Sequence, residues 1–382
     1  MRILVLGAGR MGMAIVYDLL RSPGVEQVGL ADNNQAALAR LARHYPRRRL
    51  AVHRLEAGDE PAAARLLRHY QAAVSALPYG QNLTLTRAAL RARVPLCDLG
   101  GSHQVRAAQQ RFDATARRRG VTLLPDCGLA PGLTSVLVAH GTPAFQPLEC
   151  IHIRVGGLPR RPQPPLDYAL YFSPQGLINE YAEPVEIVTG GRRRQVPPLT
   201  GLESIRFRGL PALEAFYTSG GSSTLPRTFA DVRELDEKTI RYRGHCEKIR
   251  TLAGLGWFSS RPLNLAGRRV TTRQVLVCLL EEILPANQPD VVLVRVTLVG
   301  RTRPGRRRRR LVYELRDCYD RRSGLTAMMR TTAFPASIAT QWLAQGRLPA
   351  GVHSPETALP PEAFLHELTR RGLRITRRWS PA

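Results

Sequence analysis

Three glycines near the N-terminus and one later acidic residue have the spacing of a nucleotide-binding turn. Gly7, Gly9 and Gly12 form a G-x-G-x-x-G pattern, and Asp32 follows Gly12 by 20 residues. An apolar run of strand length precedes Gly7, and apolar residues at helical spacing follow Gly12. In that setting the glycines allow a tight turn, close approach of backbone N–H groups to a pyrophosphate and close packing of the helix on the strand. The helix N-terminus then faces the phosphates, so we expect a bound dinucleotide rather than a fold of this type that has lost its ligand.

Asp32 also indicates which dinucleotide is bound. A carboxylate at the end of the second strand accepts hydrogen bonds from the ribose hydroxyls and repels the 2′-phosphate of NADP. Asn33 and Asn34 offer that phosphate no cation, so NAD is the expected cofactor. The alternative role of an acid here, a helix N-cap, suits either asparagine better. The residues expected to bind the cofactor are Gly7, Gly9, Arg10, Met11, Gly12, Asp32, Asn33, Ala76, Leu77 and Pro78.

Composition narrows the class of protein. The 382 residues are 43% hydrophobic, which allows two packed domains, and no apolar run has the length of a membrane span. The first residues carry one charge and then a strand-like run, unlike a signal peptide, so a cytoplasmic location is expected. Six cysteines without a C-x-x-C pair and nine histidines without H-x-x-x-H spacing predict reduced thiols and no metal site.

The charge of the chain is strongly positive. The net charge is +26, and all but two of its 56 basic residues are arginine. One interpretation is a polyanion-binding regulator, with the run Arg306–Arg310 as its densest patch. The other is a drift toward arginine codons, because the arginines are spread over the whole chain and the run lies between two strand-like segments, as at a solvated hairpin tip. We favour the second interpretation, so nucleic acid is not an expected partner.

Residues 1–125 alternate strand-like runs with amphipathic helical stretches, which is typical of a parallel, doubly wound α/β sheet. Ligands bind beyond the carboxyl ends of such strands. Three segments rich in glycine, proline and small residues are expected there: 75–80, 97–102 and 125–132.

From about residue 148 the pattern changes to strand-like runs separated by turns, which predicts an α+β domain with a mixed sheet. These runs include 168–172 and 326–333, and helices are expected over 270–284, 336–346 and 361–371. The expected organisation is an NAD-binding Rossmann domain (1–132), a substrate and dimerisation domain (133–335) and a segment returning to the first domain (336–382).

Several segments together resemble the saccharopine dehydrogenase superfamily, and within it most closely the L-lysine 6-dehydrogenases. They occur in order along nearly the whole chain: 126–133 (DCGLAPGL), 155–159 (VGGLP), 171–181 (YFSPQGLINEY), 213–226 (LEAFYTSGGSSTLP), 238–248 (KTIRYRGHCEK) and 334–338 (FPASI). The resemblance implies a Rossmann domain, a mixed-sheet substrate domain and C-terminal elements that return to the first domain. It also implies NAD(P)-dependent C–N oxidation or reductive amination of amino acids.

Two departures narrow the implied substrate. Fungal-type saccharopine reductases carry an aspartate and a cysteine where this chain has Ala130 and Val155. We therefore expect oxidative deamination of a side-chain amine, L-lysine first, to allysine (which cyclises to piperideine carboxylate) with release of ammonia. The alternatives are a saccharopine or carboxynorspermidine dehydrogenase and, in another class, the dinucleotide-binding regulator. The expected partners are a small amino acid substrate and further copies of the chain in a homodimer or larger homo-oligomer.

The only two lysines of the chain, Lys238 and Lys248, flank one of the matching segments, which makes that segment a functional candidate, although chance clustering is the alternative. Within it, Arg241 is the expected clamp for a carboxylate. His245 is a candidate base because imidazole titrates near neutrality, and a histidine bonded to the backbone is equally compatible. The candidate catalytic residues are His245, Asp126, Asp98 and Lys238, and the alternative for the two aspartates is capping or turn chemistry. The candidate substrate residues are Tyr171, Ser173, Glu180, Gly221, Ser222, Thr224, Arg241 and Tyr242.

Overall fold

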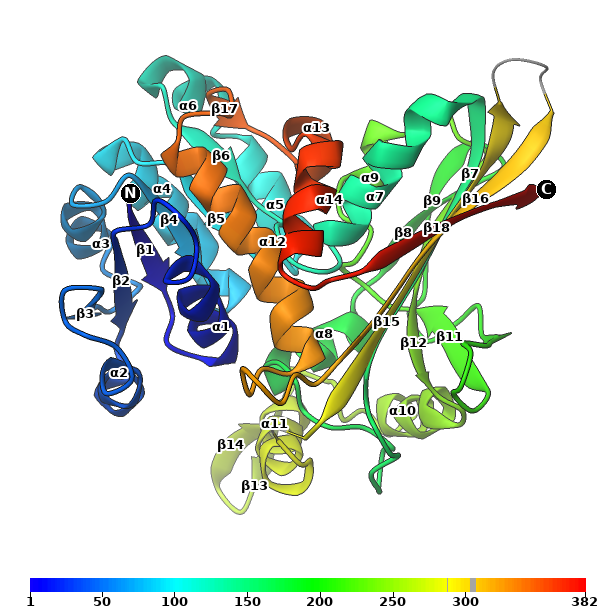
Figure 1. Cartoon of the computed structure of the whole chain (residues 1–382). Helices are drawn as coiled ribbons and strands as arrows, with labels where there is room; N and C mark the ends of the chain where they lie inside the picture. The colour runs from blue at the N-terminus through cyan, green and yellow to red at the C-terminus, as the bar shows by residue number, and fades with distance from the viewer. Residues whose placement is uncertain (287, 303–306) are drawn as a thin grey trace. The chain divides into compact units, whose positions relative to one another are not determined.

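The computed structural model describes residues 1–286, 288–302 and 307–382. It divides into two compact units (Figure 1). The first contains Met1–Pro143 and Met329–Arg374, and the second contains Ala144–Met328 and Ile375–Ala382.

The first unit is built on a parallel sheet of seven strands in the order β17-β6-β5-β4-β1-β2-β3. The order 3-2-1-4-5-6 of its first six strands is that of a Rossmann fold, which confirms the predicted fold class. Short helical connections join consecutive strands, as parallel pairing requires. The strands are β1 (Arg2–Leu6), β2 (Gln27–Asp32), β3 (Leu50–Arg54), β4 (Ala72–Ser75), β5 (Leu96–Asp98), β6 (Thr122–Leu124) and β17 (Gly351–Val352).

Helices of the C-terminal part return to this unit, as expected. Asp18 of α1 is buried, and its carboxylate accepts hydrogen bonds from Arg371 Nε at 2.9 Å and from Ser337 Oγ at 2.5 Å. These contacts join α1 to the region of α12 and α14. The helices are α1 (Arg10–Leu19), α2 (Gln35–Ala42), α3 (Glu60–Leu67), η1 (Tyr79–Gln81), α4 (Asn82–Ala92), α5 (His103–Gln110), α6 (Asp113–Arg119), α7 (Leu133–Gly141), η2 (Thr142–Ala144), α12 (Ala327–Ala344), α13 (Pro355–Ala358) and α14 (Pro361–Arg370).

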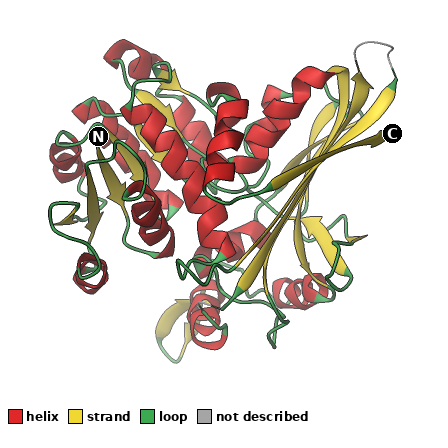
Figure 2. Ribbon diagram, viewed as in Figure 1, coloured by secondary structure: helices red, strands yellow, loops and turns green. Residues whose placement is uncertain are grey.

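The second unit contains a mixed sheet in the order β10-β11-β12-β7-β15-β16-β18, with β8 paired to β12 and β9 paired to β8 (Figure 2). Strands β7 and β12 are parallel, and the other neighbours are antiparallel. The strands are β7 (Phe145–Pro159), β8 (Val185–Thr189), β9 (Arg192–Val196), β10 (Glu203–Ile205), β11 (Leu213–Tyr217), β12 (Glu234–Tyr242), β15 (Asp290–Thr302), β16 (Arg308–Cys318) and β18 (Ile375–Pro381). A separate hairpin pairs β13 (Pro262–Leu265) with β14 (Arg268–Thr271).

The two faces of the mixed sheet have different surroundings. One face packs against a core that includes Phe216, Tyr168 and Tyr181 and that the helices of this unit help to form. The other face carries a smaller apolar cluster around Ile240 and Tyr242. The helices are α8 (Pro174–Ala182), α9 (Leu225–Thr228), α10 (His245–Gly254) and α11 (Thr272–Ile283).

Four local expectations were wrong. Residues 326–333 are not a strand but contain the start of α12, where Asp290 accepts the Ala327 and Met328 N–H groups at 2.6 and 2.8 Å. Residues 168–172 form a buried irregular segment, joined to the sequence that follows α11 by a single bridge of Leu170 to Ala286. Residues 308–310 lie in β16 rather than at a hairpin tip, and Arg306 lies outside the described residues. Within the expected returning segment 336–382, β18 pairs with β16 of the second unit instead.

No helix in the described parts of the chain is both long and apolar enough to cross a membrane.

Candidate functional site

The turn between β1 and α1 has the geometry that a dinucleotide needs. Gly7 has φ +109°, a region that glycine adopts readily, and its N–H donates to Ala31 O at 2.8 Å. A Cβ at Gly12 would overlap the carbonyl oxygen of Gly7, so close helix–strand contact requires glycine there. The space beside Gly9 is open to 4 Å, at the N-terminus of α1. The turn therefore leaves room for a pyrophosphate against backbone N–H groups.

Asp32 ends β2 beside a pocket of about 190 Å³. Its two carboxylate oxygens accept from the Ala8 N–H at 2.6 Å and the Asn34 N–H at 2.7 Å, which fixes the carboxylate against the glycine turn. A second carboxylate, Glu56, accepts from Asn33 Nδ2 at 3.1 Å on the same pocket. Among the described residues that line this pocket there is no lysine or arginine. Leu77 and Pro78 line it as expected, with Ala76 directly before them in the chain.

Asp98 and Asp126 lie at the carboxyl ends of β5 and β6, as expected, but both are engaged in building the loops there. Asp98 is fully buried and accepts from Gln109 Nε2 at 2.7 Å, Gly100 N at 2.8 Å and Asp126 N at 3.3 Å. Burial raises the pKa of Asp98, and these hydrogen bonds oppose the rise. Asp126 has φ +68° and lies 3.6 Å from Arg106 Nε. The hydrogen bond from Gly100 N to Asp98 and the positive φ of Asp126 match the turn alternative for these aspartates.

In the second unit a buried cluster surrounds Arg241 of β12. The guanidinium is 2% exposed and lies 4.7 Å from the centre of the Tyr168 ring. Arg241 Nε donates to Tyr181 Oη at 3.0 Å, and Arg241 Nη2 lies 3.6 Å from a carboxylate oxygen of Glu180. Both Tyr181 and Glu180 come from the end of α8. A buried guanidinium whose ion pair with Glu180 is long is suited to binding a further carboxylate.

His245 supports this cluster from the start of α10. Its Nδ1 lies 2.7 Å from Leu166 O, which can only accept, so Nδ1 carries the proton and Nε2 accepts from Tyr181 Oη at 3.0 Å. Burial and the nearby charge of Arg241 lower the pKa of His245 to about 3. The expectation that His245 titrates near neutrality is therefore wrong. Its neutral ring holds Tyr181, which in turn holds Arg241.

Glu237 lies on the same face of β12 as Arg241 and was missed by the sequence analysis. It is 2% exposed, and its Oε2 has no hydrogen-bond partner among the described residues. Burial and the neighbouring Glu180 raise the pKa of Glu237 to about 8. A Cβ at Gly221 would overlap this carboxyl group, so the glycine-rich loop lies directly against it. The alternation of side chains along a strand could have revealed Glu237, because residues 237 and 241 lie on the same face of β12.

Other expected site residues lie apart from the cluster. Side chains alternate between the two faces of β12, so Lys238 and Tyr242 lie on the face opposite to Arg241. Lys238 Nζ binds Glu203 at 2.6 Å, and Tyr242 Oη donates to Pro159 O at 2.8 Å. They face the other side of the sheet, so the structure does not bring Lys238 to Arg241 or His245. Ser173 caps α8 by accepting from Gly176 N at 3.1 Å.

Three further expected substrate residues lie around the edge of the cluster. Tyr171 is buried in edge contact with Tyr168. Ser222 Oγ donates to Glu186 O at 3.4 Å, and Thr224 immediately precedes α9. Within the described ranges, no three His, Cys, Asp or Glu side chains are placed to hold a metal ion.

Comparison with known proteins places this geometry in a family. Residues 3–124 match the saccharopine dehydrogenase NADP binding domain, and residues 128–373 match the saccharopine dehydrogenase C-terminal domain. The chain belongs to the saccharopine dehydrogenase family. Membership confirms the predicted superfamily and makes the protein an oxidoreductase of amino-acid chemistry with a nicotinamide dinucleotide as its cofactor.

One solved structure shares the fold of this saccharopine dehydrogenase family member over nearly its whole length. It is similar to apo saccharopine dehydrogenase (L-Glu forming) from Saccharomyces cerevisiae, with a TM-score of 0.80, 17% identity and 99% of each chain covered. Serine dehydrogenase from Escherichia coli matches at a TM-score of 0.28 and 15% identity, over 35% of this chain and 86% of that one. A putative myo-inositol dehydrogenase from Sinorhizobium meliloti matches at a TM-score of 0.34 and 14% identity, over 63% of this chain and 69% of that one.

Proposed function

We propose that this family member is an NAD-dependent dehydrogenase that oxidises the amine-bearing side-chain carbon of an amino acid, with L-lysine as the first candidate. The observation that carries the proposal is the buried cluster of Arg241, Glu180 and Glu237. It offers a cation and two carboxyl groups together in an apolar setting, which suits the carboxylate and ammonium of an amino acid.

The pocket beside Asp32 supports NAD rather than NADP. The ribose hydroxyls are donors, and the carboxylate of Asp32 is an acceptor fixed against the glycine turn. A 2′-phosphate in this pocket would meet two carboxylates, Asp32 and Glu56, and no cation from the residues that line it. Because the negative phosphate and the two carboxylates repel one another, the pocket disfavours NADP.

The proposed reaction balances without a further reactant. The substrate R–CH₂–NH₃⁺ reacts with NAD⁺ and water to give R–CHO, NH₄⁺, NADH and H⁺. The cofactor accepts the hydride from the amine-bearing carbon. The protein's contribution is binding: Arg241 holds the α-carboxylate, and Tyr181 and His245 hold Arg241 in place. Glu180 and Glu237 are placed to accept hydrogen bonds from the α-ammonium.

The test is turnover by the purified full chain with L-lysine, ornithine, diamines and other amino acids, each with NAD and with NADP. Lysine deuterated at C6 identifies the oxidised carbon, because the label then appears in the reduced cofactor. We expect reduction of NAD by lysine with transfer of the C6 label.

Transfer from lysine labelled at C2 would contradict side-chain oxidation. Oxidation of NAD(P)H only when lysine is supplied together with a 2-oxoacid would replace the proposal with the reductive, saccharopine-type reaction. Absence of turnover with every amine in both directions would favour a dinucleotide-binding regulator.

A further inference from the structure

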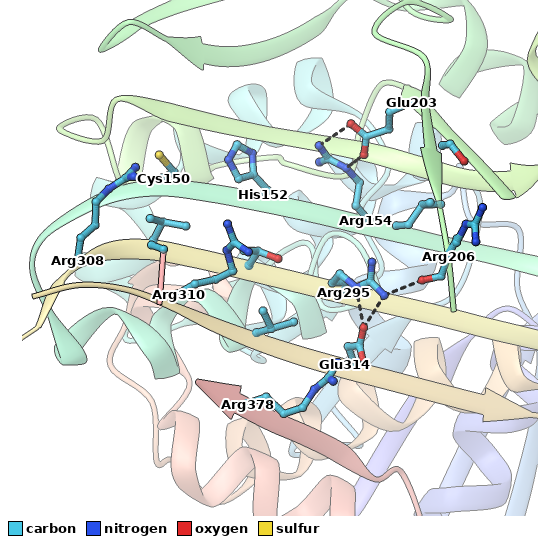
Figure 3. A pocket seen from close by; sticks show the side chains of 16 residues that line it. Cys150, His152, Arg154, Glu203, Arg206, Arg295, Arg308, Arg310, Glu314 and Arg378 are labelled. Carbon is cyan, nitrogen blue, oxygen red and sulfur yellow. Dashed lines mark hydrogen bonds and ion pairs between the residues drawn. The ribbon is translucent and has the colours of Figure 1, made fainter. Parts of the chain in front are cut away.

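The face of the mixed sheet opposite to Arg241 carries a hollow of about 650 Å³ lined by arginines (Figure 3). Its floor consists of short side chains from the central strands, among them Thr297, Val299 and Val312. The arginines around this floor come from the strands β7, β15, β16 and β18 and, for Arg206, from the residue directly after β10. The basic residues that line the hollow are Arg154, Arg206, Arg295, Arg308, Arg310 and Arg378, together with His152.

Cations occupy directly opposed positions across this face. Lys238 is opposite Arg154, and Arg154 is opposite Arg295, so three neighbouring strands carry basic residues in one row. Like charges in opposed positions destabilise a sheet. Carboxylates balance part of the charge: Glu203 binds Arg154 and Lys238, and Asp236 binds Arg154 and His152. Glu314 binds Arg295 and Arg378, each at 2.6 Å, and Glu149 binds Arg308 at 2.8 Å.

Two arginines of the hollow remain without such a partner. Arg206 and Arg310 are exposed, and neither side chain makes a hydrogen bond or ion pair with any described residue. In Figure 3 no interaction is drawn to the guanidinium group of either residue, and the dashed line at Arg206 ends on its backbone carbonyl oxygen. The carboxylates at this face therefore leave an excess of positive charge, and Arg206 and Arg310 are available to a ligand.

The positions of these two arginines set the size of that ligand. The Arg206 carbonyl accepts from Arg295 at 2.8 Å, which places Arg206 at one end of the hollow. Arg310 is opposite Val299, four residues along β15 from Arg295, or about 13 Å at strand spacing. The uncharged pair of Thr297 and Val312 lies between these two positions on β15 and β16. The volume lies in the range of small-molecule sites, of roughly 300–1,000 Å³.

We propose that this hollow binds a small molecule carrying two or more oxyanion groups, of which a polyphosphate is the best match. Guanidinium groups bind phosphate and carboxylate oxygens in pairs, and a ligand of this length can reach both ends of the floor. A second copy of the chain is disfavoured because two such surfaces, each with excess positive charge, repel one another. The site is separate from the Arg241 cluster and independent of the proposed dehydrogenase reaction.

The test is isothermal titration of the full chain with inorganic tripolyphosphate, with citrate as a tricarboxylate arm and a 20-nucleotide single-stranded DNA as a polymer arm. Saturating NAD keeps the glycine turn occupied. The pocket variant is Arg206→Ser/Arg310→Ser. The matched control is Arg192→Ser/Arg194→Ser, which removes two exposed arginines from β9, outside the hollow.

We expect one tripolyphosphate per chain, at least about tenfold weaker binding in the pocket variant, and no change in the control. Tighter binding of tripolyphosphate than of citrate identifies phosphate as the preferred group, and the reverse identifies a polycarboxylate in the same site. No binding by the wild type, an equal loss in the control, or tighter binding of the DNA would each overturn the proposal. A dimer that dissociates in the pocket variant, without tripolyphosphate binding, would assign the face to a second copy instead.

Discussion

Replacing Glu237 with glutamine should make the protein more stable at alkaline pH. The wild-type carboxyl is buried beside Glu180, which raises its pKa from 4.5 to about 8. A raised folded-state pKa means that the folded protein binds this proton more tightly than the unfolded chain does. Stability therefore falls as the pH rises from the unfolded value toward the folded one. Glutamine resembles the protonated acid and cannot ionise, so the variant avoids this loss.

The linkage relation gives the size of the effect. With these two pKa values, ionisation of Glu237 costs the wild type more stability at pH 9 than at pH 5.5. The advantage of Glu237→Gln should thus grow by about 3 kcal/mol between these pH values. In a unit of this size, that is on the order of 10 °C in the unfolding temperature.

Thermal and urea unfolding of the wild type, Glu237→Gln and Glu281→Gln at pH 5.5, 7 and 9 measure this difference. Glu281 is an exposed glutamate on α11, so its replacement removes a carboxylate without burial and should show no such trend. Groups that do not interact with Glu237 titrate equally in all three proteins and cancel. A Glu237→Gln advantage that stays constant with pH, or that shrinks as the pH rises, would refute the reasoning.

Four further outcomes are expected. Asp32→Ser should weaken NAD by roughly 10- to 150-fold, the cost of about 1.5–3 kcal/mol for charged hydrogen bonds, and narrow the preference over NADP; a wild-type preference for NADP would contradict the assignment. Arg241→Met should raise the KM for the amino acid by a similar factor while leaving NAD affinity unchanged, as measured by initial rates and fluorescence titration. Lys238→Arg should change turnover less than about threefold, because Lys238 faces away from Arg241; a larger loss would return it to the site. Lysine oxidation should accelerate from pH 7 toward 9–10 as the neutral amine, with a pKa of about 10.4, becomes available; a flat profile would show that binding lowers the amine pKa strongly.

The first unit was predictable because its signals are local. The glycine turn, the strand before it and the acid that ends β2 lie within the first 32 residues. Alternating strands and helices can form a parallel sheet in only a few strand orders. Arg241 and Glu180, proposed from segments that resemble a family, lie side by side in the second unit, and their role in substrate binding stays a prediction.

The remaining parts of the site depend on partners that are distant in the chain. The apolar start of α12 has the pattern of a strand, and its helix is capped by Asp290, 37 residues earlier. Lys238 and Arg241 are three residues apart, but the alternation along β12 sends them to opposite faces. His245 was expected to titrate near neutrality from its residue type alone. Its pKa is lowered by burial among side chains from other segments, such as Tyr181 of α8, and by the charge of Arg241.

The contacts of Asp18 also bear on the order in which the protein can be completed during synthesis. Helix α1, which carries the glycine turn at its start, leaves the ribosome among the first residues, whereas Ser337 and Arg371 follow more than 300 residues later. Until then the carboxylate of Asp18 lacks the partners that accompany its burial, and β17 is missing from the edge of the sheet. The nucleotide-binding unit therefore cannot finish folding as an independent N-terminal piece, and a nascent chain should gain its full affinity for the dinucleotide only after the second unit has been made.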